Sequence, residues 1–93
     1  MNQYEGVFII DADLEEDATE AAIEEIEAMI AQHSGAVHNS ERWGKKSLCY
    51  EIKKHRDGYY VLVDFEAEPG QVKALNSEYR LVPQILRHAI FLR

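Results

Sequence analysis

YYVLVDFEA, residues 59–67, is dense in aromatic and β-branched side chains, a composition typical of a β-strand. The segment before it, from Ala36 to Lys54, alternates loosely between polar and apolar residues and reaches a clean period of two from Leu48 to Ile52. Gly44 predicts a bend or bulge in this long strand. Because His55-Arg56-Asp57-Gly58 is rich in turn-forming residues, we expect the two strands to form a hairpin.

One helix is expected on each side of this hairpin. Before it, Asp13 is the expected N-cap, and Gly35 is placed to end the helix. The apolar stripe of this helix comprises Ala22, Ile23, Ile26, Met29, Ile30 and His33. After the hairpin, Pro69-Gly70 breaks the chain. A short second helix is indicated by the helical spacing of Val72, Leu75 and Tyr79.

Two apolar strands complete the pattern, Val7 to Ile10 near the start and Ile85 to Leu92 after Pro83. The resulting order, βαββαβ, predicts an α+β ferredoxin-like fold, with a four-stranded antiparallel sheet and both helices on one face. Since the first strand is apolar on both sides, the sheet face without helices is expected to expose apolar surface, which usually marks a partner site.

Length and composition favour one small cytoplasmic domain spanning residues 1–93. With 93 residues and 46% hydrophobic content, the chain has material for a single core. The lone Cys49 excludes an internal disulfide and a cysteine-based metal cluster, which favours a reducing compartment. No apolar run approaches the roughly 20 residues of a membrane helix, and the N-terminus lacks signal-peptide character. We therefore expect no membrane partner and no export.

The net charge of −7 hides an uneven distribution. Residues 1–36 contain ten acids and no Lys or Arg, whereas residues 37–56 contain six Lys or Arg and two acids. A local basic segment allows an acidic chain to dock one face on RNA while the rest is repelled. The alternative is that these charges only solvate a strand.

The residues that resemble catalytic or metal sites have simpler explanations. The acids from Asp11 to Asp17 lack the glycine and ligand spacing of a calcium loop and are interpreted as helix capping. The four histidines are scattered without metal-ligand spacing. An acylphosphatase would need a basic phosphate loop after the first strand, where this chain has Asp11-Ala12-Asp13. We expect no catalytic residue, metal, cofactor or small-molecule substrate, and hence no enzyme.

The segment from Arg42 to Ile52, RWGKKSLCYEI, is the strongest candidate for binding. Lys45 and Lys46 lie beside Trp43, and Tyr50 follows along the strand, so phosphate-seeking charges stand next to rings that can stack on a base. In the alternative reading, the aromatic residues pack on the sheet and the lysines protect an edge strand from aggregation.

Several strings resemble one known family. They are Tyr4-Glu5, Trp43-Gly44-Lys45-Lys46, Leu48-Cys49-Tyr50-Glu51-Ile52, Gly58-Tyr59-Tyr60-Val61-Leu62, Arg80-Leu81 and Leu86-Arg87. Together, and in this order, they resemble protein six of the bacterial small ribosomal subunit, which implies the same βαββαβ fold. The chain departs from the family pattern at Asn2-Gln3, which is neutral where many members are basic, and at Glu51, where a proline is common.

The resemblance implies a structural protein of the ribosome that binds the central domain of small-subunit ribosomal RNA jointly with small-subunit protein eighteen. Carried over by position, Tyr4, Lys45, Lys46 and Arg87 are expected to meet RNA or the partner. Arg42, Trp43 and Tyr50 are further candidates. The charge of Arg87 in an otherwise apolar strand also fits a salt bridge to an acid such as Glu5.

A second class of function competes with this one. A ligand-sensing regulatory domain of ferredoxin-like fold pairs its open sheet face with a second copy and forms a small-molecule pocket between them. The absence of a glycine-rich ligand turn in the sequence disfavours this alternative.

Overall fold

The structure is a computed structural model that describes residues 1–52 and 54–93, with the side chains of Cys49 and Tyr50 outside that description. Six elements follow one another in the predicted order βαββαβ. They are β1 (Asn2–Asp11), α1 (Glu16–Gln32), β2 (Ala36–Ile52), β3 (His55–Ala67), α2 (Pro69–Tyr79) and β4 (Ile85–Leu92).

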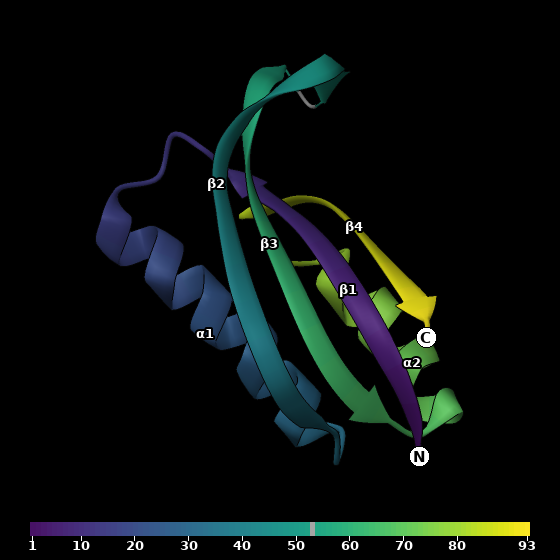
Figure 1. The fold of residues 1–93 in the computed structure, drawn as a ribbon. Helices are drawn as coiled ribbons and strands as arrows, with labels where there is room; N and C mark the ends of the chain where they lie inside the picture. The colour runs from purple at the N-terminus through teal and green to yellow at the C-terminus, as the bar shows by residue number, and fades with distance from the viewer. Residues whose placement is uncertain (53) are drawn as a thin grey trace.

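The four strands form one antiparallel sheet in the order β2-β3-β1-β4. Both helices lie behind this sheet in Figure 1, so one face is covered and the other is open. This arrangement is the predicted ferredoxin-like fold. Neither helix in the described part of the chain has the length and apolar character to cross a membrane.

The core lies between the helices and one side of the sheet. Phe8 and Ile10 of β1 pair with Val61 and Tyr59 of β3, and alternate β3 residues through Phe65 are buried on the same side. The α1 residues that the stripe predicted are buried against them, except His33, which is partly exposed. Tyr79 of α2 is fully buried, and its hydroxyl donates a hydrogen bond to the Ile26 carbonyl oxygen of α1 at 2.8 Å.

The expected start of α1 was wrong. The helix begins at Glu16, with Glu15 as N-cap and no side-chain capping bond. Asp13 lies in the preceding turn, where its backbone N–H donates to Asp11 Oδ1 at 2.9 Å. The Asp11 side chain therefore stabilises the turn after β1. Asp13 contributes its backbone N–H to this turn and does not cap the helix.

The end of α1 also differs from the expectation by one residue. Ser34, with φ 63°, takes the left-handed conformation that closes the helix, and its N–H donates to the Ala31 carbonyl. Gly35 follows, and its N–H donates to the Ile30 carbonyl at 2.9 Å. A Cβ at Gly35 would lie 2.8 Å from the Glu66 carbonyl oxygen, so glycine allows the chain to pass close to β3.

The predicted hairpin is present, but its turn lies earlier than expected. Ile52 pairs with His55, and Lys54 has φ 69°, so residues 55–58 belong to β3 and not to the turn. Gly58 instead permits close packing, because a Cβ there would overlap Ile9 Cγ2. The bulge predicted at Gly44 is confirmed by a shift in strand register between Arg42 and Gly44, where Gly44 has φ 84°.

Pro69-Gly70 does not break the chain as expected but begins α2, with Pro69 in the first turn. The fixed φ of proline suits the first helical position, where its missing N–H has no helical partner to lose. The last strand, Ile85–Leu92, has the predicted bounds.

The open face of the sheet carries the apolar residues that the sequence predicted. Val7 pairs with Leu62, and Ile9 pairs with Tyr60, on the side away from the helices. All four side chains are partly exposed. This strip of Val7, Ile9, Tyr60 and Leu62, here called the open-face strip, runs down the two central strands.

Replacing Gly58 by alanine is expected to destabilise the fold by about 1–3 kcal/mol, because the new methyl group would force Ile9 or the β1–β3 pairing to move. Gly70 is the matched control, since nothing lies within 4 Å of a Cβ there. Its alanine variant is expected to be neutral or more stable by up to about 1 kcal/mol. Urea denaturation of both variants measures the difference, and equal effects would contradict this role of Gly58.

His33 joins the ends of the two helices. Its Nδ1 lies 2.7 Å from Gln71 Oε1, and its Nε2 contacts the Glu78 carboxylate, both on α2. Two oxygen acceptors favour a ring with a proton on each nitrogen. The hydrogen bonds to Gln71 and Glu78 accordingly raise the pKa of His33 above 6.5.

The contribution of His33 to stability is expected to depend on pH. Because its pKa is raised in the folded protein, the stabilisation is fully present below pH 6.5 and is lost as pH rises through the folded pKa. Urea midpoints of the native chain and of H33Q, measured from about pH 5 to about pH 9, should differ most at the acid end and converge at the alkaline end. A difference that is constant with pH would contradict the doubly protonated ring.

Candidate nucleic-acid interface

The basic segment lies on β2, which is an edge strand of the sheet. Lys45 pairs with Tyr59, and Lys46 pairs with Gly58, the last β3 residue that also pairs with β1. Beyond that point β2 and β3 continue as a two-stranded ribbon, which rises above the rest of the sheet in Figure 1. Lys45 and Lys46 therefore lie where the four-stranded sheet ends and the β2–β3 hairpin extends beyond it.

Trp43 and Lys46 form an exposed pair on this edge. The Trp43 side chain is 50% exposed, and its Nε1 donates to Glu41 Oε2 at 3.1 Å. Lys46 Nζ lies 5.2 Å from the centroid of the Trp43 ring, within the range of a cation–π contact. The structure thus brings together a cation and an aromatic ring that the sequence predicted to be neighbours, and it leaves both at the surface.

Arg42 points to the other side of β2, towards the helices. Its Nε and Nη2 donate to the two carboxylate oxygens of Glu20 on α1, at 2.8 and 2.9 Å. These hydrogen bonds raise the pKa of the Arg42 guanidinium. Because the Glu20 carboxylate accepts hydrogen bonds from both Nε and Nη2, a phosphate would have to displace Glu20 to bind these two donors of Arg42.

Lys45 is exposed, with its Nζ 3.8 Å from Asp57 Oδ2 across the hairpin. It also lines a hollow of about 460 Å³ between β2 and the start of α1, together with Arg42 and Tyr59. An exposed ion pair at this distance contributes little to stability, so the Lys45 ammonium can exchange one anionic partner for another at small cost.

Tyr4 is placed far from these residues. It is buried, with 7% of its surface exposed, and its ring stacks on Phe65 at a centroid distance of 5.7 Å. Lys46 pairs with Gly58, which lies seven positions before Phe65 on β3. This distance is about 24 Å along the strand. Tyr4 lines a hollow of about 240 Å³ together with His38 and Arg93.

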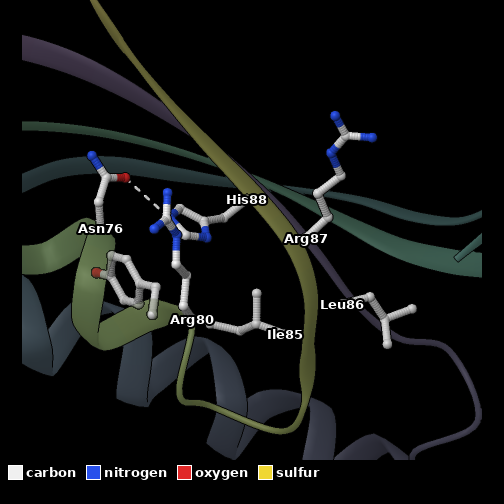
Figure 2. Close-up of a pocket in the computed structure, with 7 residues that line it drawn as sticks. Asn76, Arg80, Ile85, Leu86, Arg87 and His88 are labelled. Carbon is white, nitrogen blue, oxygen red and sulfur yellow. Dashed lines mark hydrogen bonds between the residues drawn. The ribbon is translucent and has the colours of Figure 1, made fainter. Parts of the chain in front are cut away.

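Arg87 stands on the opposite border of the open-face strip. It pairs with Ile9 of β1, and its side chain is exposed. Figure 2 shows its guanidinium directed away from His88, whose ring turns to Asn76 of α2 on the other side of β4. Glu5, the acid considered for a salt bridge, pairs instead with Phe91, four residues further along β4.

The predicted residues therefore fall into three places. Arg42, Trp43, Lys45 and Lys46 share the β2 edge, where Arg42 and Lys45 border the hollow next to α1; Arg87 lies across the open-face strip, and Tyr4 lies in the core at the far end of the sheet. Tyr50 belongs to β2 by its backbone, but its side chain is outside the described residues.

Sequence reasoning passed over two polar residues near Arg87. Arg80 and His88 line a hollow of about 310 Å³ between α2 and β4. His88 Nε2 lies 3.0 Å from Asn76 Oδ1, its ring stacks near Phe8, and burial together with the nearby Arg80 charge lowers its pKa. A neutral histidine packed on an aromatic core has a structural role. Because His88 directly follows Arg87 in a β-strand, the sequence could have predicted that the two side chains face opposite sides of the sheet.

Residues 3–91 match the model of the family described as ribosomal protein S6. The chain belongs to the ribosomal protein S6 family. Small ribosomal subunit protein bS6 of Moorella thermoacetica is 39% identical over 90 residues, which cover 97% of this chain and 92% of that protein. The corresponding protein of Clostridium kluyveri is 38% identical, with 97% and 95% covered.

The fold agrees with a solved member of the same family. The crystal structure of 30S ribosomal protein S6 from Thermotoga maritima matches with a TM-score of 0.92 at 31% identity, covering 99% of this chain and 87% of that one. The resemblance inferred from the sequence strings is confirmed. As an S6 family member, the protein is a structural constituent of the bacterial ribosome and not an enzyme.

Replacing Trp43 or Tyr4 by alanine is expected to reduce the free energy of unfolding by very different amounts. Trp43 is half exposed at a strand edge, so W43A should cost less than about 1 kcal/mol. Tyr4 is buried against Phe65, so Y4A should cost about 3 kcal/mol or more. Urea denaturation followed by far-UV circular dichroism measures both. A large loss in W43A would favour the alternative that Trp43 mainly packs on the sheet.

Proposed function

We propose that this S6 family protein binds the central domain of small-subunit ribosomal RNA together with small-subunit protein eighteen. The observation that carries the proposal is the exposed group of Trp43, Lys45 and Lys46 on the β2 edge of an otherwise acidic molecule. We call this group the β2 basic edge.

The chemistry of the β2 basic edge suits a folded RNA. Two ammonium groups supply sequence-independent phosphate contacts, and an exposed indole supplies a surface on which an unpaired base can stack. The cation–π contact holds Lys46 near the Trp43 ring in the free protein. A phosphate that draws Lys46 away leaves the ring face open to a base.

The remaining candidates have unequal roles in this proposal. Arg87 adds a cation across the open-face strip, and Tyr50 extends the aromatic character of β2. Arg42 contributes only where RNA displaces Glu20, and Tyr4 supports the sheet from the core or meets a partner at the chain termini. We therefore expect Lys45, Lys46 and Arg87 to dominate the salt dependence of binding.

A protein partner follows from charge and from the open-face strip. The net charge of −7 opposes RNA binding by this chain alone, so a basic companion would supply the missing counter-charge. The strip of Val7, Ile9, Tyr60 and Leu62 offers that companion partly exposed apolar surface between the β2 basic edge and Arg87. Protein eighteen on this face would adjoin Lys46 and Arg87.

The binding test uses a central-domain fragment of small-subunit ribosomal RNA, with and without protein eighteen, across a salt series. We expect tight binding only with the partner, weakening as salt rises. Neutralising Lys46 or Arg87 to glutamine should lower the slope of log K against log salt by about one unit each if both contact phosphate. K73Q is the matched control, since Lys73 is exposed on α2 behind the sheet and should leave the slope unchanged.

Two results would overturn the proposal. Absence of binding in both conditions would remove the RNA role, and equal slopes for K46Q, R87Q and K73Q would show that the β2 basic edge and Arg87 do not contact phosphate. A tight dimer of the chain alone in gel filtration would favour the ligand-sensing alternative, in which a second copy covers the open-face strip.

A further inference from the structure

Three potential metal ligands meet where β1 ends. Asp11 closes β1, Asp13 lies in the loop to α1, and His55 begins β3 after the hairpin turn. One ligand atom from each lies within 4.8 Å of the other two. His55 Nδ1 is 3.6 Å from Asp11 Oδ1 and 3.8 Å from Asp13 Oδ2.

Backbone contacts hold this cluster in place. Asp11 pairs with Gly58 of β3, and its N–H donates to the Gln84 carbonyl at 2.9 Å, so the end of β1 is fixed on both sides. The bond from the Asp13 N–H to Asp11 Oδ1 curls the loop back and turns Asp13 towards β3. The strand pairing and this turn thus hold the backbone of Asp11 and Asp13 in place without help from an ion.

Their exposure suits a site open to solvent on one side. The side chains of Asp11 and His55 are 25% and 26% exposed, whereas Asp13 is 81% exposed. Two ligands are therefore held against the protein, and the third can close over an ion.

The donor set identifies the class of ion. Imidazole nitrogen and carboxylate oxygen are both ligand types of zinc, and a water can take the fourth position. Bonds of about 2.0–2.2 Å in tetrahedral geometry place neighbouring ligand atoms roughly 3.3–3.6 Å apart. The observed 3.6 and 3.8 Å need only small side-chain shifts to reach that spacing. Calcium prefers six to eight oxygens, and magnesium prefers oxygen over nitrogen, so neither fits as well.

We propose that Asp11, Asp13 and His55 form a binding site for a divalent transition-metal cation of the zinc class. The ion would link the β1–α1 loop to the base of the β2–β3 hairpin. The competing state is an ion-free cluster in which His55 lies between the two carboxylates as in an ordinary surface ion pair.

The test is a titration of the full chain with Zn²⁺, in which binding is measured by isothermal titration calorimetry. It is done with Cys49→Ser, so that the lone thiol does not take the metal. We expect one saturable site per chain and a rise in the thermal midpoint when Zn²⁺ is in excess. H55Q and D11N should each weaken binding by about tenfold or more, since each removes a ligand or its charge. Asparagine at position 11 can still accept the Asp13 N–H bond, so D11N keeps the turn.

H38Q is the matched control. His38 Nε2 lies 3.6 Å from Glu66 Oε1, so it also pairs with a carboxylate, and its removal should not alter Zn²⁺ affinity. Co²⁺ in place of Zn²⁺ should give the visible absorption of a four-coordinate nitrogen–oxygen site, absent in H55Q. Lack of saturable binding, or equal losses in H55Q and H38Q, would overturn the site. Circular dichroism of each variant confirms that lost binding is not lost folding.

Discussion

The structure depends on the central position of β1, a strand that is apolar on both sides. Phe8 and Ile10 are fully buried beneath the helices, while Val7 and Ile9 face the open side. Two helices cover only one face of a four-stranded sheet, so the fold cannot bury both sides of its own central strand. The open-face strip is therefore a direct consequence of the topology, and exposed apolar surface of this kind usually marks an interaction site.

Acidic and basic side chains lie on different elements of this fold. The acids of α1 lie behind the sheet, and the cations of β2 lie on its edge, with the bidentate contact between Arg42 and Glu20 joining the two regions. That contact ties the edge strand to the helix and pairs one β2 cation with an acid. The β2 basic edge is thus presented at a defined angle, while α1 repels phosphate from the opposite face.

The sequence predicted the order and approximate position of the helices and strands, because these depend on patterns among neighbouring residues. The two-residue and 3.6-residue periods located every element, and Pro83 marked the start of β4, because hydrophobic burial sets those patterns. The turn at residues 55–58 was misplaced because Gly58 serves contact with Ile9, which only the β1–β3 pairing reveals. The Trp43–Lys46 contact was foreseeable from spacing, whereas His55 meets Asp11 and Asp13 only after long-range strand pairing, which no local pattern encodes.

The hairpin links the two proposed sites mechanically. The β2 basic edge lies just below the point where β1 support ends, and His55 lies at the free end of the same two strands. An ion that ties His55 to the β1–α1 loop would restrict the ribbon before RNA arrives. A restrained ribbon loses less conformational freedom on binding, so the ion would strengthen RNA affinity without touching the RNA. The cluster would then act through the rigidity of β2.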